Sequence, residues 1–374
     1  MGQHLGPGVK RLFNLLPAWL GRPREGRLLV FIDLVQDIDV LLPLCVAFRD
    51  DGRLKLRIVV SHWLARQSPR TAQLLAAHGF EFAYVSRRKV IDGVAPPLGG
   101  VAGVLLASES THGAHSASRT LARRARAAGI KTYLLQHGLE NIGLFGVEAR
   151  DATFESDVVF CWYPPAVIPD DLPSQTLPKL VHAGRPAPLG GWGRGETPAF
   201  DLGVFENLHW VRYTDAERQA FQDNLAAVAQ ALPAARILLR PHPAGAWADR
   251  LSHELARFNN ITLARASETR GRLEGGAQVL RGIRRVITTP STVALDSALS
   301  GLPTALAMAG GGVYEPLPVL GAAQDWIDFA SGESDDSTAI DLFRRRVLVE
   351  GDGAPRIVER LSRDLASDSL TAHG

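Results

Sequence analysis

The chain has 374 residues, of which 46% are hydrophobic and 21% are charged, and its formal net charge is only +2. This length exceeds what one hydrophobic core usually serves, so we expect two domains. The small net charge argues against a nucleic-acid partner, because the basic residues are spread along the chain. The arginines within residues 119–126 are interpreted as a solvated helix face. Two cysteines, Cys45 and Cys161, form neither a disulfide framework nor a metal-ligand cluster.

The N-terminal residues 1–26 are predicted to form an amphipathic arm. Residues 9–20 carry apolar side chains at helical spacing, with Lys10 and Arg11 among them. Two interpretations stay open: the arm lies on an anionic membrane surface, or it packs on its own protein. No stretch approaches the roughly 20 apolar residues of a membrane-spanning helix, and the chain begins without the apolar core of a secretory signal. We expect a cytoplasmic protein, with peripheral contact at the inner face of the membrane if the first interpretation holds.

Strand and helix patterns alternate through the first half of the chain. Strands are predicted over residues 28–33, 54–61, 80–85, 101–107, 131–135 and 158–162, and helices over 38–48, 69–78 and 116–128. Uninterrupted apolar strands that alternate with helices indicate a parallel sheet covered on both faces. Residues 27–190 are therefore predicted to be a Rossmann-like domain.

A second alternation follows a segment rich in Pro and Gly, residues 164–198, which indicates an interdomain linker. Strands are predicted over residues 202–207, 236–240, 261–264, 286–289 and 304–307, and helices over 215–232, 247–258, 323–329 and 339–349. Thr214 is predicted to be the N-cap of the helix over 215–232. Residues 198–332 are predicted to be a second Rossmann-like domain, followed by C-terminal helices and a tail over 333–374. The predicted fold class is α/β, with two Rossmann-like domains facing each other across a cleft that holds the active site.

Two motifs in the second half have the composition of a phosphate site. Residues 237–243 read Ile-Leu-Leu-Arg-Pro-His-Pro, and residues 286–292 read Val-Ile-Thr-Thr-Pro-Ser-Thr. Arg240, His242, Ser291 and Thr292 follow or end strands, where helix N-termini and loops offer backbone N–H groups to an anion. Each residue also has a structural interpretation: Arg240 pairs with a carboxylate, His242 lies in a turn, and Ser291 and Thr292 cap a helix.

Catalytic candidates follow two strands of the first domain. Asp37 and Asp39, in the loop that also holds Asp33, are candidates for a general base or a nucleophile, and helix capping is the alternative. His137 and Glu140 follow the strand at 131–135 and are the rival candidates. The sequence does not rank these four residues.

Glu206 and Asn207 end the first strand of the second domain, and we expect them to contact the phosphate or the sugar of the donor, with a structural loop as the alternative. No metal site is predicted in residues 198–332.

The order of these features resembles the GT-B glycosyltransferase superfamily. His242-Pro243 with the later Ser291-Thr292 is similar to the pattern of bacterial enzymes that use CMP- or CDP-linked donors: sialyltransferases, capsule Kdo transferases and teichoic-acid glycerophosphotransferases. Residues 296–303 are similar to an element whose acidic residue holds the nucleotide ribose, which implies that role for Asp296. This chain departs from the element in having Asp296 where many members have Glu.

The resemblance implies a glycosyltransferase that moves a sugar from a CMP- or CDP-type donor to a carbohydrate or glycolipid acceptor in bacterial surface polysaccharide synthesis, whether capsule or lipopolysaccharide. Residues 27–190 would bind the acceptor and residues 198–332 the nucleotide donor. No cofactor is expected, since the nucleotide-sugar is a co-substrate. The alternatives are a UDP-N-acetylhexosamine epimerase of the same architecture and a non-catalytic scaffold subunit.

Overall fold

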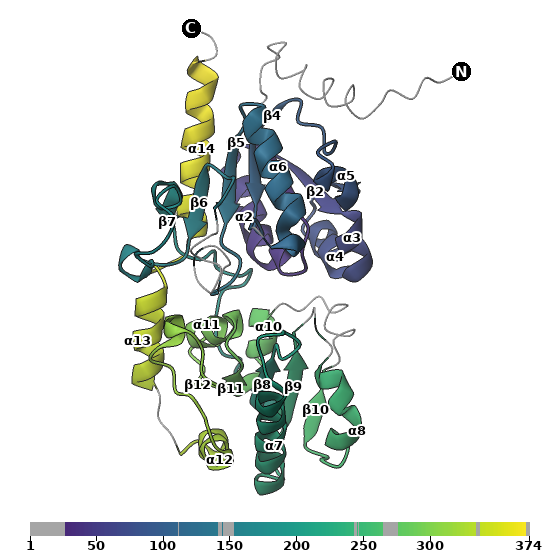
Figure 1. Ribbon diagram of the computed structural model, residues 1–374, viewed down its shortest axis with the longest axis vertical. Coiled ribbons are helices and arrows are strands. Elements are labelled where there is room, and N and C mark those ends of the chain that lie inside the picture. The colour runs from purple at the N-terminus through teal and green to yellow at the C-terminus, as the bar shows by residue number, and fades with distance from the viewer. Residues whose placement is uncertain are drawn as a thin grey trace, which may run out of the picture. The chain divides into compact units, whose positions relative to one another are not determined.

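The computed structural model describes residues 27–110, 112–140, 144, 153–242, 245, 247–264, 276–333 and 337–371 (Figure 1). The predicted arm of residues 1–26 and Pro243 lie outside the described residues. The chain forms two compact units. The first unit comprises Met1–His137, Asn141–Leu189 and Leu348–Gly374, and the second comprises Gly138–Glu140 and Gly190–Val347. Among the described residues no helix is long and apolar enough to cross a membrane.

The first unit is built on a seven-stranded parallel sheet in the order β3-β2-β1-β4-β5-β6-β7. Its strands are β1 (Arg27–Ile32), β2 (Lys55–Ser61), β3 (Phe82–Val85), β4 (Val101–Leu106), β5 (Lys131–Leu135), β6 (Val158–Cys161) and β7 (Leu180–His182). The strand order reverses between β1 and β4. In open parallel sheets such a switch point leaves a crevice at the carboxyl ends of the strands, which is where ligands bind.

Helices cover both faces of this sheet, as the uninterrupted apolar strands predict. They are α2 (Asp37–Asp51), α3 (His62–Gln67), α4 (Arg70–Ala77), α5 (Arg87–Ile91), α6 (Ser116–Ala127) and α14 (Ala354–Thr371). On one face, Phe31 and Val104 belong to the same buried cluster as Leu121 of α6. Figure 1 shows α6 in front of the sheet. All six residues of β4 are buried, which fixes this strand at the centre of the unit.

The last helix, α14, returns to the first unit. Ile357 and Leu361 are fully buried, and α14 packs beside α2. Gly103 of β4 gives the helix room, because a methyl group there would lie 3.1 Å from the Leu365 side chain. Asp364 forms an ion pair with Lys131 of β5 at 3.0 Å. Residues about 230 positions apart in the chain therefore share one core.

The second unit has a five-stranded parallel sheet in the order β10-β9-β8-β11-β12. Its strands are β8 (Phe200–Glu206), β9 (Ile237–Pro241), β10 (Ile261–Leu263), β11 (Ile283–Thr288) and β12 (Thr304–Leu306). Its helices are α7 (Asp215–Ala231), α8 (Ser252–Leu255), α10 (Gly276–Leu280), α11 (Thr292–Leu299), α12 (Ala323–Ser331) and α13 (Ser337–Val347). The switch point lies between β8 and β11.

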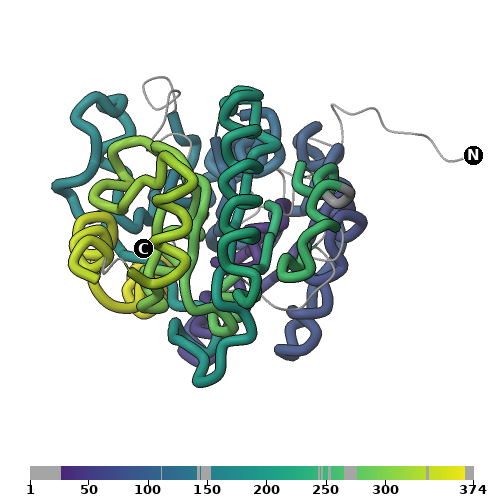
Figure 2. The backbone as a smooth tube through the Cα atoms, turned by 90° about the horizontal axis from the view of Figure 1, so that it is seen from below, coloured from purple at the N-terminus to yellow at the C-terminus, as the bar shows by residue number. Residues whose placement is uncertain are grey.

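Helices α7 and α12 lie side by side on one face of this sheet (Figures 1 and 2). Their contact includes an edge-to-face pair of Phe221 and Trp326, with ring centroids 5.4 Å apart. Helix α7 begins at the predicted cap: Thr214 Oγ1 accepts a hydrogen bond from Glu217 N, and the Glu217 side chain accepts one from Thr214 N. This capping box satisfies backbone N–H groups that the helix itself leaves unpaired.

Most predicted strands and helices are confirmed within a few residues. The helix predicted over 247–258 is instead a 3-10 turn, Ala248–Leu251, followed by the single turn of α8. The buried residues Ala248 and Leu251 are three positions apart, which matches the 3-10 period. The linker predicted over 164–198 contains β7, which adds an edge strand to the first sheet.

Candidate functional site

Three adjacent strand ends of the second unit come together. His242 N donates a hydrogen bond to Glu206 O at 2.7 Å, which joins the end of β9 to the end of β8. Asn207 N donates to Thr289 Oγ1 at 3.0 Å, and this bond joins β8 to the loop after β11. The predicted donor residues Glu206, Asn207 and His242 therefore lie at one edge of the sheet, beside the switch point.

Glu206 is 3% exposed and organises two loops. Its carboxylate accepts hydrogen bonds from Leu208 N at 2.6 Å and from Ala248 N at 3.3 Å. Burial raises the pKa of Glu206 to about 7, and the two backbone hydrogen bonds oppose that effect. A carboxyl group with such a pKa exists in both protonation states near neutral pH.

Two imidazole rings stack at the end of β9. The ring centroids of His209 and His242 are 5.1 Å apart, with 28° between the ring planes. Burial and, to a smaller extent, the charge of His209 lower the pKa of His242 to about 4. Burial also lowers the pKa of His209. Both rings are therefore neutral at pH 7, and each has one N–H with which to donate.

His209 was not predicted from the sequence as a site residue. Gly245, which lies against the His209 ring, is the sequence signal that could have indicated it. A methyl group at Gly245 would clash with the His209 ring. A glycine two residues after a His-Pro dipeptide indicates a close approach of the backbone to another group. The identity of that group depends on the tertiary contact.

The loop after β11 leads into α11, whose first turn holds Ser291 and Thr292. Ser291 is the N-cap residue, but its side chain makes no capping hydrogen bond and its Oγ lies 3.1 Å from Thr288 Oγ1. Thr292 Oγ1 accepts a hydrogen bond from Leu139 N at 2.9 Å. Ser291 is therefore the N-cap by position but not through its side chain. Because Thr288 Oγ1 donates its proton to Thr289 O, Ser291 Oγ is the donor to Thr288 Oγ1, and both hydroxyls lie at the start of the helix.

Arg212 connects several groups beside this loop. Its guanidinium donates to Glu140 Oε2 at 2.7 Å, to the Tyr213 hydroxyl at 2.9 Å and to Pro290 O at 3.0 Å. Glu140, a catalytic candidate, is therefore an ion-pair partner that holds Arg212 in place. Arg240 lies at the end of β9, paired in register with Phe205 of β8, and is half-buried. Asp296 is half-buried in α11, so its predicted ribose contact stays a prediction.

In the first unit, Asp37 holds the turn after β1. It is 1% exposed, and its Oδ2 accepts hydrogen bonds from Asp33 N at 3.0 Å and from Leu34 N at 2.9 Å. Its Oδ1 accepts a hydrogen bond from Ser108, which follows β4. Burial raises the pKa of Asp37 to about 6. One oxygen of this carboxylate therefore stabilises the turn before α2, and the other binds Ser108.

Asp33, four residues earlier, has a carboxylate oxygen to spare. It is fully buried, and Arg87 Nε donates to Oδ2 at 2.9 Å. Oδ1 is buried and has no hydrogen-bond partner among the described residues. Burial raises the pKa of Asp33 to about 6 against the opposing effects of Arg87 and the Ser61 hydroxyl. Buried carboxyl groups with raised pKa are candidates for proton transfer.

Asp39, by contrast, lies on the outer side of α2. Arg70 Nη2 donates to its Oδ1 at 2.5 Å, and the Asp39 side chain is 42% exposed. The other acidic residue at these strand ends, Glu109, accepts hydrogen bonds from the backbone and the side chain of Ser156. Both carboxylates therefore have structural partners.

Three histidines gather at the ends of β4 and β5. The ring centroids of His115 and His137 are 5.3 Å apart, and those of His112 and His115 are 5.7 Å apart. Ser110 Oγ lies 2.5 Å from His115 Nδ1. Burial lowers the pKa of His115 to about 3 and that of His137 to about 4, so both are neutral. Within the described part of the chain, His, Cys, Asp and Glu side chains form no group that could hold a metal ion.

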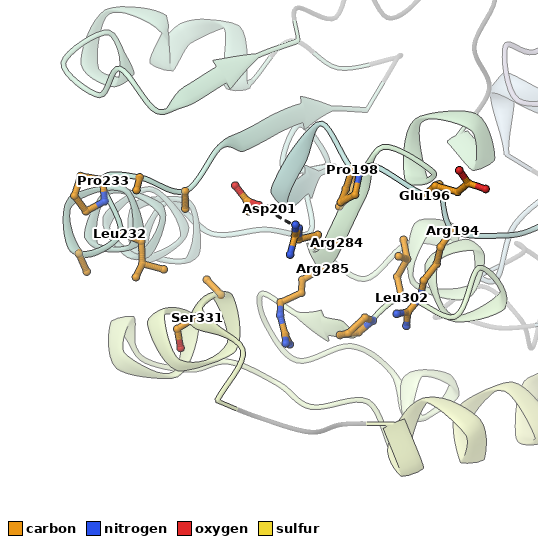
Figure 3. Close-up of a pocket in the computed structure, with 17 residues that line it drawn as sticks. Arg194, Glu196, Pro198, Asp201, Leu232, Pro233, Arg284, Arg285, Leu302 and Ser331 are labelled. Atoms are coloured by element: carbon orange, nitrogen blue, oxygen red, sulfur yellow. Dashed lines mark ion pairs between the residues drawn. The ribbon is translucent and has the colours of Figure 1, made fainter.

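A pocket of about 820 Å³ opens at the opposite edge of the second sheet (Figure 3). Its lining includes Asp201 near the start of β8, Arg284 near the start of β11, and Leu232 just after α7. Asp201 and Arg284 form an ion pair at 3.3 Å. Ligands of open parallel sheets bind at the carboxyl ends of the strands, and none of the predicted site residues lines this pocket.

No family model and no curated protein matches the sequence. Solved structures match the fold over most of both chains. The S. aureus MnaA–UDP structure is 11% identical, with a TM-score of 0.64, and the match covers 91% of this chain and 97% of that chain.

A putative UDP-N-acetylglucosamine 2-epimerase from Listeria monocytogenes is 12% identical, with a TM-score of 0.63 and coverage of 89% and 94%. The glycotransferase of kitacinnamycin is 14% identical, with a TM-score of 0.57 and coverage of 91% and 99%. The chain therefore has the two-domain Rossmann-like fold of the GT-B type.

Proposed function

We propose that the protein acts on a nucleotide-activated sugar and binds the diphosphate or phosphate of that ligand at the carboxyl ends of β8, β9 and β11. The observation that carries the proposal is the convergence of His242, Ser291 and Thr292 beside the switch point of the second sheet. Hydroxyl and N–H donors at a helix start are suited to an anion.

The chemistry of such a ligand explains these donors. When the bond between the sugar and the phosphate breaks, negative charge grows on the leaving phosphate. Fixed donors that bind this charge more tightly than they bind the intact ligand lower the barrier. Because His242 is neutral at pH 7, it contributes a hydrogen bond to the phosphate rather than a full charge.

Two reactions begin with this step. The first is the 2-epimerisation of a UDP-N-acetylhexosamine, which is favoured by the names of two solved structures, UDP-N-acetylglucosamine 2-epimerases with TM-scores of 0.63 and 0.59. The second is transfer of a sugar from a CMP- or CDP-type donor to an acceptor hydroxyl, which is favoured by the motifs at His242 and Ser291-Thr292 and by the kitacinnamycin glycotransferase. We place epimerisation first.

Both reactions also need a group that accepts a proton. Among the four predicted candidates, Asp37, Asp39 and Glu140 have structural partners. Burial lowers the pKa of His137 to about 4, which makes its imidazole a weak base. Asp33, with its unpaired Oδ1 and a pKa of about 6, fits the task better than Asp37. Among the residues of the first unit, we therefore propose Asp33 as the proton acceptor.

The test is incubation of the purified protein with UDP-N-acetylglucosamine without an acceptor, followed by NMR of the sugar. Conversion to the 2-epimer is the expected result. His242→Ala should lower the rate of conversion about 100-fold. His78→Ala is the matched control, because His78 ends α4 in the first unit, away from the strand ends.

If the 2-epimer does not form, transfer from CMP- and CDP-linked donors to carbohydrate acceptors is assayed next. Normal rates in His242→Ala would contradict the site assignment. A complete lack of turnover and of nucleotide binding would favour the scaffold alternative and overturn the proposal.

A further inference from the structure

The side chain of Asn207 has one hydrogen-bonding atom that the fold does not use. Asn207 directly follows β8 and is 6% exposed. Its Nδ2 donates to Pro290 O at 2.9 Å, while its Oδ1 is buried and accepts no hydrogen bond from any described residue. Buried polar atoms are nearly always paired, so an unpaired acceptor at a strand end indicates a ligand.

The orientation of the amide follows from its surroundings. If Oδ1 and Nδ2 were exchanged, the amide oxygen would face the Pro290 carbonyl oxygen at 2.9 Å, and two acceptors would repel each other. The backbone holds the residue from the other side, because Asn207 N donates to Thr289 Oγ1 at 3.0 Å. Asn207 thus presents an acceptor that is fixed from two directions.

The polarity of this atom selects the ligand group. An amide oxygen only accepts, and the oxygens of an ionised phosphate also only accept, so Asn207 Oδ1 does not bind phosphate. The group that it takes must carry a hydrogen, as a hydroxyl or an N–H does. In this respect Asn207 complements the donors at Ser291 and His242, which suit the phosphate.

We propose that Asn207 is a specificity-determining residue whose Oδ1 accepts a hydrogen bond from a hydroxyl or N–H group of the nucleotide-activated sugar. This inference rests on the proposed function and assigns a ligand chemistry to one atom of the same site. A ligand that lacks the matching group leaves Oδ1 buried and unpaired, so the site discriminates against it. The group belongs either to the sugar or to the nucleoside.

The experiment is calorimetric titration of matched ligands: UDP-N-acetylglucosamine with UDP, GDP-mannose with GDP, and CMP-N-acetylneuraminate with CMP. For the pair that the wild-type protein binds, single-deoxy analogues are then titrated against wild type and Asn207→Ala. One deoxy analogue should bind wild type about 10- to 100-fold more weakly than its parent. The same analogue and its parent should bind Asn207→Ala equally.

A structural role would not give this result, because a distorted loop would weaken the parent and the analogue alike. The comparison of the parent with its deoxy analogues on the wild-type protein needs no variant, so it still tests the inference if Asn207→Ala does not fold. Asn260→Ala is the matched control, since Asn260 Nδ2 donates only to the backbone carbonyls of Ala229 and Leu232. It should bind as wild type does.

The position of the effective deoxy substitution tells whether the group is on the sugar or on the nucleoside. If wild type binds every deoxy analogue as tightly as the parent, the inference is wrong while the proposed function stands. If wild type binds none of the six ligands and no CDP-linked donor, the proposed function is wrong and the inference is wrong with it.

Discussion

Asp33 and Asp37 lie four residues apart at the end of β1, and burial raises the pKa of both to about 6. The two carboxyl groups differ in the hydrogen bonds that they accept. Asp37 uses both oxygens for the turn and for Ser108, whereas Asp33 keeps Oδ1 unpaired among the described residues. At the residue scale, a raised pKa therefore identifies candidate residues for proton transfer. The hydrogen-bond partners of each carboxyl group then distinguish a structural role from a catalytic one.

Glu206→Gln tests the raised pKa in the second unit. Because the folded protein holds Glu206 protonated up to pH of about 7, while the unfolded chain loses that proton near its ordinary pKa of about 4.3, wild-type stability should fall as pH rises between these values. The variant has no such proton. Urea unfolding at pH 4.5 to 7.5 should therefore show wild type losing free energy of unfolding relative to Glu206→Gln, and a pH-independent difference would contradict the raised pKa.

Gly245→Ala tests the stacked imidazoles. The added methyl group would clash with the His209 ring, so the ring should move away from His242 and nucleotide affinity should fall about 10-fold. Titration with UDP measures the effect. Gly193→Ala is the control, since a methyl group there meets nothing within 4 Å; an equal loss in both variants would rule out the specific contact with His209.

At the scale of elements, the position of α14 is the clearest case of a helix fixed by tertiary contacts. Its apolar residues Ile357 and Leu361 are buried against the first sheet rather than the second unit, from which the chain has just come. Gly103 provides the space, and the Asp364–Lys131 ion pair lies beside it. The helix therefore completes a core that begins more than 200 residues earlier.

Leu361→Ala tests this packing. Leu361 is fully buried, and removal of its side chain should leave a cavity that lowers the free energy of unfolding by about 2–5 kcal/mol. Leu342→Ala, on a side chain of α13 that is 48% exposed, should change it by about 0.5 kcal/mol or less. Denaturant unfolding measures both, and similar values for the two variants would mean that α14 does not pack in solution as described.

At the scale of the whole molecule, two parallel sheets each have a switch point where strand order reverses, β1/β4 in the first unit and β8/β11 in the second. Asp33 and Asp37 in the first unit, and Glu206, Asn207 and His242 in the second, lie at the carboxyl ends of strands. The pocket in Figure 3 opens at the other edge of the second sheet. The topology of each sheet, rather than the size of a cavity, locates its candidate site.

Ligand binding should stabilise the folded chain. A nucleotide at 100 times its Kd adds about 2.7 kcal/mol to the free energy of unfolding if it binds only the folded state. Thermal unfolding with UDP, CDP, CMP and GDP should therefore raise the Tm most for the preferred base. The same screen on His242→Ala should give a smaller rise, and equal shifts in both proteins would place nucleotide binding elsewhere.

Local pattern was enough to predict the fold class, most strand positions and the cap of α7. Apolar runs, helical spacing and Thr214–Glu217 act over a few neighbouring residues, so the sequence displays them directly. The strand-end motifs at His242 and Ser291 were visible for the same reason: each lies where a short apolar run stops.

Only the tertiary structure shows which side chains contact one another. Three contacts join residues that lie far apart in the chain: the ion pair of Arg212 with Glu140, the stacking of His209 on His242, and the packing of α14 in the first unit. The unpaired Oδ1 of Asp33 likewise depends on which groups surround it in the folded protein. A sequence pattern records which residue types lie near one another along the chain. Hydrogen-bond partners and desolvation depend on which segments meet in space, and those contacts set the pKa and the role of each side chain.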